Sequence, residues 1–103
     1  MVNRPFEEHV RRALDALPPQ IAKRLENVAV VVEEANREEP DLYGLFETPE
    51  WMPSKITIYR RPLERLWGAD PTRLRREIRR VVLHEVAHHF GISDERLIEI
   101  DRY

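Results

Sequence analysis

The residues best suited to do chemistry lie near the carboxyl end of the chain, in the segment His84-Glu85-Val86-Ala87-His88. Histidines four residues apart on a helix share one face, with Cβ atoms about 5–6 Å apart, so both imidazoles can reach a single metal ion. Glu85 is rotated by roughly 100° around the helix axis, which makes it a poor ligand but a suitable acceptor for a proton from metal-bound water. The spacing therefore predicts a metal centre on His84 and His88, with Glu85 as the catalytic base.

A catalytic zinc needs a third protein ligand and an open coordination position. Gly91 allows the chain to reverse just after the expected helix, and Asp94 follows where the longer metalloprotease motif has its last histidine. Asp94 is therefore the expected third ligand, although it also precedes a short helix that it could cap; Ser93 could provide that cap instead. Zinc is the metal expected for two histidines and one carboxylate, and iron is the alternative.

These residues resemble the zincin-like metallopeptidases, and within them a small bacterial family of minimal zincins. The segment 82–97 carries most of the resemblance, and segments 13–19, 27–33 and 58–64 add to it. The resemblance implies a zincin-like fold, zinc held by His84, His88 and Asp94, and Glu85 as catalytic base. It implies no particular substrate.

Two features depart from the larger metzincins. Their methionine-containing turn follows the motif, whereas Met1 and Met52 both precede it here. Few residues follow Asp94, so we expect a site that is open or completed by another subunit.

The motif must be positioned by a long helix over residues 71–90. Asp70 and Pro71 are typical of a helix start, and Gly91 of a left-handed stop. In the first half of this helix, apolar residues occupy one face and arginines much of the other, which predicts a surface helix. The second half is apolar around most of its circumference, so we expect it to enter the interior and to carry the two histidines and Glu85 with it.

The remaining pattern predicts an α+β, zincin-like fold in one domain over residues 1–103. We expect a mostly mixed sheet of about three strands, packed against an N-terminal helix, the long active-site helix and a short C-terminal helix. The apolar run 28–32 reads as a buried central strand, and 55–59 as a strand with one buried face. The other expected elements are a short strand at 42–46, helices at 5–17, 20–25 and 94–100, and a helical turn at 63–67.

Composition narrows the possible partners. Lysine and arginine number 17 against 19 acidic residues, and the formal net charge of -2 gives no reason to expect nucleic acid or a membrane surface. The absence of cysteine excludes thiolate ligands, disulfides and a cysteine nucleophile. No apolar run reaches the length of a membrane span or a signal peptide, so a cytoplasmic location is the default expectation.

The leading hypothesis is a zinc metallopeptidase that acts on a peptide or protein substrate, with no prediction of its oligomeric state. The alternatives are a non-catalytic, zinc-stabilised interaction module and a hydrolase of other amides. His89 points away from the other two histidines, so we expect it to pack or to bond backbone rather than to bind metal. The arginines at 73, 75, 76, 79 and 80 favour a solvated helix face paired with Glu77, and an acidic partner is the alternative.

Overall fold

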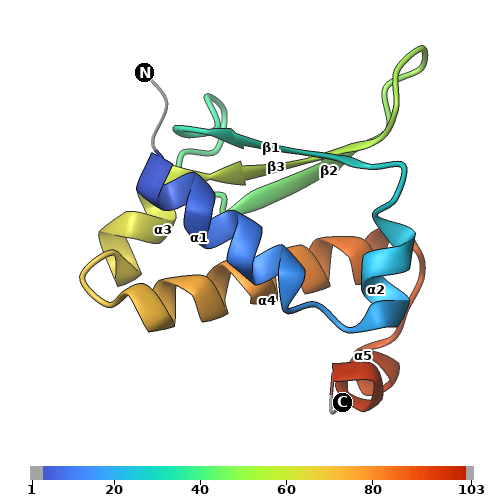
Figure 1. The fold of residues 1–103 in the computed structure, drawn as a ribbon. Helices are drawn as coiled ribbons and strands as arrows, with labels where there is room; N and C mark the ends of the chain where they lie inside the picture. Colours follow the sequence, from blue (N-terminus) through green and yellow to red (C-terminus); the bar gives the residue numbers. More distant parts are fainter. Residues whose placement is uncertain (1–3, 102–103) are drawn as a thin grey trace.

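The computed structural model describes residues 4–101 and contains one three-stranded sheet with helices packed beneath it (Figure 1). Its elements follow the expected α+β pattern closely. In chain order they are α1 (Arg4–Asp15), α2 (Pro19–Arg24), β1 (Ala29–Glu33), β2 (Gly44–Glu47), β3 (Lys55–Tyr59), α3 (Arg60–Trp67), α4 (Pro71–His89) and α5 (Asp94–Asp101).

The sheet is mixed, with the strand order β1-β3-β2. β1 pairs in parallel with β3, so that Val31 faces Thr57, and β2 pairs with β3 in antiparallel fashion, so that Leu45 faces Thr57. The expectation of a buried central strand at 28–32 was wrong: β1 is an edge strand, and its residues are partly or fully exposed. The fully buried Ile56 and Ile58 belong to β3, which is the central strand.

The core lies between the sheet and the helices on one of its faces (Figure 1). It is formed mainly by apolar side chains of α1, β3 and α4, among them Phe6, Ile58, Ile78 and Val86, all with no exposed surface. Large aliphatic side chains buried in this way supply most of the free energy of folding, at about 1.5–3 kcal/mol each. The core therefore fixes α4 firmly under the sheet.

α4 begins and ends close to the residues that the sequence marks as helix boundaries, Asp70 and Gly91. The Asp70 carboxylate accepts a hydrogen bond from the backbone N–H of Arg73 at 3.2 Å and caps the first turn. Gly91 has φ +67°, in the left-handed region that glycine adopts without steric cost, and the chain reverses there. No helix within residues 4–101 is long and apolar enough to cross a membrane.

Candidate metal centre

His84 and His88 lie one turn apart on α4, as their spacing predicts. Their ring centroids are 6.4 Å apart and the ring planes meet at 69°. Both side chains are exposed, and neither imidazole makes a hydrogen bond to another residue in the described part of the chain. The expectation that this half of α4 enters the interior and carries the two histidines with it was wrong for the histidines: Val82, Leu83, Val86 and Ala87 are buried, whereas His84 and His88 are exposed. The two imidazoles are consequently free to bind an ion from solvent.

Glu85 occupies a different environment, half-buried between α4 and β2. Burial raises the pKa of its carboxyl group, because desolvation disfavours the charged form. The backbone N–H of Phe46 donates a hydrogen bond to this carboxylate and, together with His88 and His84, moves its pKa in the opposite direction. Burial is the larger effect. A carboxyl group with a raised pKa is a stronger base, which suits proton transfer near neutral pH.

Gly44, which the sequence did not single out, allows β2 to pass close over α4. A Cβ atom at this position would lie 2.6 Å from Cγ1 of Val81 and 3.7 Å from Cγ of Glu85. Two carbon atoms that are not bonded to each other do not come as close as 2.6 Å. A side chain at this position would therefore push the strand and the helix apart. The missing side chain of Gly44 therefore keeps the edge strand β2 beside the candidate base.

A cleft of about 390 Å³ opens beside His84 and Glu85. Its lining comes from the segment that leads into β2, from the end of α3 and from α4. Tyr43 and Trp67 line it with their rings 5.7 Å apart, and the Arg73 guanidinium lies 5.8 Å from the Trp67 ring centre. Arg73 is also paired with the buried Glu77 at 3.1 Å. The cleft thus has an aromatic wall adjoining two of the predicted site residues.

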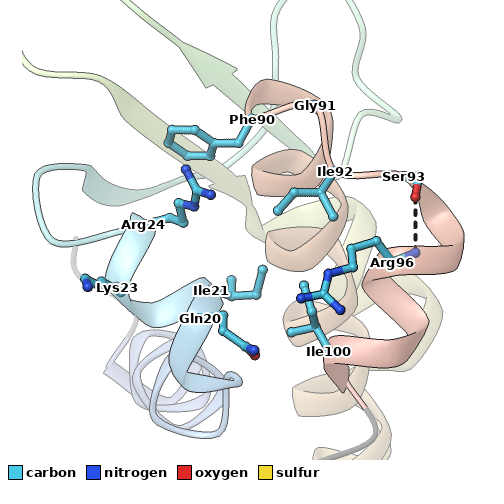
Figure 2. Close-up of a pocket in the computed structure, with 10 residues that line it drawn as sticks. All are labelled: Gln20, Ile21, Lys23, Arg24, Phe90, Gly91, Ile92, Ser93, Arg96 and Ile100. Atoms are coloured by element: carbon cyan, nitrogen blue, oxygen red, sulfur yellow. Dashed lines mark hydrogen bonds between the residues drawn. The ribbon is translucent and has the colours of Figure 1, made fainter.

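The third predicted ligand, Asp94, is the first residue of α5 and is exposed. The cap of this helix is Ser93, whose Oγ accepts a hydrogen bond from the backbone N–H of Arg96 at 3.1 Å (Figure 2). The Asp94 carboxylate is therefore not used as the helix cap. Within residues 4–101, however, no three histidine, cysteine, aspartate or glutamate side chains are grouped so that they could hold a metal ion.

His89 packs against a side chain of β2. Its ring stacks on that of Phe46, with centroids 3.8 Å apart and an interplanar angle of 16°. This contact lies on a different side of α4 from His84 and His88, as the helical spacing predicts. The stacked pair also attaches the last turn of α4 to β2.

The donor chemistry of the site fits zinc in part. Two neighbouring imidazoles with no hydrogen-bond partner among residues 4–101 are suitable nitrogen ligands, and the carboxylate of Glu85 lies on the adjoining side of α4. The remaining oxygen donor is not in place in this conformation.

A family model described as zincin-like metallopeptidase matches residues 25–103, which include the whole of the sheet, α4 and α5. None of the curated proteins matches the chain.

Proposed function

Because the chain belongs to the zincin-like metallopeptidase family, we propose that it is a zinc-dependent peptidase with its active site on α4. One observation carries the proposal: His84 and His88 lie exposed on one face of α4, while Glu85 between them reaches the cleft under β2. Family membership implies zinc binding and peptide or protein substrates in general terms. The assignment of roles to individual residues is our inference.

His84 and His88 would hold the zinc ion, and Asp94 would complete the ligand set. The proposal for Asp94 is supported by the capping role of Ser93, which leaves the Asp94 carboxylate without a hydrogen bond from another residue in the described range. Asp94 also follows His88 closely in the sequence, after the chain reversal at Gly91. Bringing its carboxylate to the ion would require Asp94 to be placed differently from its position in this structure, because the three side chains are not grouped here.

Zinc, when bound, would polarise the scissile carbonyl group and make a water molecule acidic enough to be deprotonated near neutral pH. Glu85 would accept that proton and deliver it to the leaving amine, as its raised pKa and its place on the cleft allow. The hydrogen bond from the Phe46 N–H holds the Glu85 carboxylate in this orientation.

The substrate would lie along β2 in an extended conformation. β2 is an edge strand, so its outer backbone groups are not used by the sheet and can pair with an added strand. The aromatic wall formed by Tyr43 and Trp67 would then receive an apolar side chain next to the scissile bond. Strand pairing gives affinity for any peptide, whereas the cleft would select among side chains.

A second candidate function is a zinc-binding interaction module without hydrolytic activity. The observation that favours it is the absence of a three-donor group within residues 4–101. A two-histidine site with no third protein ligand would still recruit a carboxylate from a partner protein, but it would not hold the metal as a catalytic site requires.

The test is Glu85→Gln, with Glu95→Gln, at an exposed position on α5, as the matched control. We expect zinc content to be unchanged in both variants and hydrolysis of a mixed peptide library to be lost only in Glu85→Gln. Retained hydrolysis in Glu85→Gln would refute the role of the base. A wild-type protein that binds zinc and cleaves no member of the library would favour the interaction module.

A further inference from the structure

A second cleft, of about 820 Å³, lies between α2 and the turn that joins α4 to α5, and neither His84, Glu85 nor His88 lines it (Figure 2). Side chains from three separate parts of the chain line it: α2, the turn at 90–93, and α5. The part of the wall contributed by Lys23 and Arg24 precedes the residues matched by the family model. The family match therefore covers the turn and α5 but not the two basic residues of α2.

The charged side chains of this cleft are all positive. They are Lys23, Arg24 and Arg96, and no aspartate or glutamate is among the lining residues. In the described part of the chain, Lys23 and Arg24 form no ion pair, whereas Arg96 is paired with Glu99 at 3.0 Å. Two cations without an ion pair thus lie at the rim of one hollow, the Arg24 guanidinium beside Phe90 and the Lys23 amine on the outer side of α2 (Figure 2), in a chain whose net charge is -2. Such a concentration of one sign of charge attracts a ligand of the opposite sign.

The floor of the cleft is apolar. Ile21 and Ile100 line it with exposed fractions of 0% and 5%, and the partly buried Ile92 adds to the same apolar surface (Figure 2). At one side the Arg24 guanidinium lies 5.1 Å from the centre of the Phe90 ring, which holds the cation over the opening. A ligand that fills this cleft must therefore bring an apolar group to the floor and a negative charge to the rim.

We propose that this cleft binds a peptide segment in which an apolar side chain is flanked by carboxylates. The apolar side chain would contact the isoleucines of the floor, and the flanking carboxylates of the peptide would lie near Arg24 and Lys23 at the rim. A nucleic acid is a poorer match, because the floor is aliphatic and the only ring in the lining, Phe90, is already covered by Arg24. The cleft shares the 90–93 turn and α5 with the proposed ligand Asp94, so binding of the peptide is tested on metal-free protein, where peptidase activity plays no part.

The experiment is a fluorescence anisotropy titration of metal-free protein with a labelled peptide, Gly-Glu-Leu-Glu-Leu-Glu-Gly, and with its counterpart in which glutamine replaces each glutamate. We expect the glutamate peptide to bind and the glutamine peptide to bind at least about tenfold more weakly. The double variant Lys23→Gln/Arg24→Gln should weaken binding about fivefold to tenfold, since each exposed charge pair contributes modestly. Arg24→Lys, which keeps the charge, should retain most of the affinity.

The matched control removes two exposed or partly exposed positive charges elsewhere, Arg37→Gln/Arg75→Gln, and should leave the affinity within about twofold. An equal loss in the control, equal binding of the two peptides, or preference for single-stranded DNA or anionic vesicles would overturn the proposal. A backbone amide NMR titration of the wild type provides a second readout that requires no variant to fold. Shifts should concentrate at residues 20–24 and 90–96, and shifts confined to other residues would contradict the assignment.

Discussion

Replacing Gly44 by alanine should separate β2 from α4 and destabilise the protein. The added Cβ would lie 2.6 Å from Cγ1 of Val81 and 3.3 Å from the carbonyl oxygen of Thr57, whereas carbon atoms in contact prefer about 3.5–4.0 Å. Strand and helix must move apart by about 1 Å to relieve the first contact. Overpacking of this kind costs about 1–3 kcal/mol, and each kcal/mol lowers the Tm of a domain of this size by about 4–8 °C.

The assay is thermal unfolding followed by circular dichroism, on Gly44→Ala, Val81→Ala and the double variant. Val81→Ala alone should cost roughly 1 kcal/mol, because its side chain is only half-buried. It also removes Cγ1, the atom that the new methyl group meets. The double variant should therefore be more stable than the sum of the two single losses implies, by at least about 1 kcal/mol.

Gly91→Ala is the control for glycine replacement in general. Nothing lies within 4 Å of a Cβ at Gly91, so its cost comes only from the left-handed backbone, at about 1–2 kcal/mol. Val81→Ala should not reduce that cost. Strictly additive losses for Gly44→Ala and Val81→Ala would refute the argument that Gly44 is needed for close contact with α4.

Two further predictions concern Glu85 and the cap of α4. The pKa of the Glu85 carboxyl group is raised in the folded protein. As pH rises above about 4.5, this carboxyl group loses its proton more readily in the unfolded chain than in the folded one, and the free energy of unfolding falls. In metal-free protein, Glu85→Gln should therefore have a higher Tm than the wild type at about pH 7. The difference in Tm should disappear below about pH 4. A wild type that is more stable than Glu85→Gln at about pH 7 would contradict this prediction. Asp70→Ala should lower the free energy of unfolding by about 0.5–2 kcal/mol in urea titrations, because the bond to the Arg73 N–H is lost, whereas Asp70→Asn should lose much less.

Local features of the fold could be predicted from the sequence. Asp70, Pro71 and Gly91 mark the ends of α4 because capping and left-handed turns depend on residues that are neighbours in the chain. The role of β1 could not be predicted in the same way. Its valines indicate a strand, but its place at the edge follows from the parallel pairing with β3, which a periodic pattern does not encode.

The candidate site likewise has features that the sequence predicts and others that depend on tertiary packing. The shared face of His84 and His88 follows from helical geometry alone. The cleft depends on Tyr43 and Trp67, which come from segments far apart in sequence and meet only through the packing of α3 and β2 against α4. Gly44 carries no motif, and its importance is visible only once Val81 lies beneath it. The position of Asp94 relative to the histidines depends on how α5 packs, which sequence spacing does not fix.

The most direct test of the proposed function is the zinc content of the purified protein, measured by elemental analysis after one fixed chelator treatment and zinc add-back. We predict about one zinc per chain in the wild type. The zinc should be lost in His84→Ala and His88→Ala, weakened in Asp94→Ala, and unchanged in Ser93→Ala, which removes only the cap of α5. A wild type without zinc above background, or full zinc content in the histidine variants, would contradict the metal centre and the peptidase activity built on it.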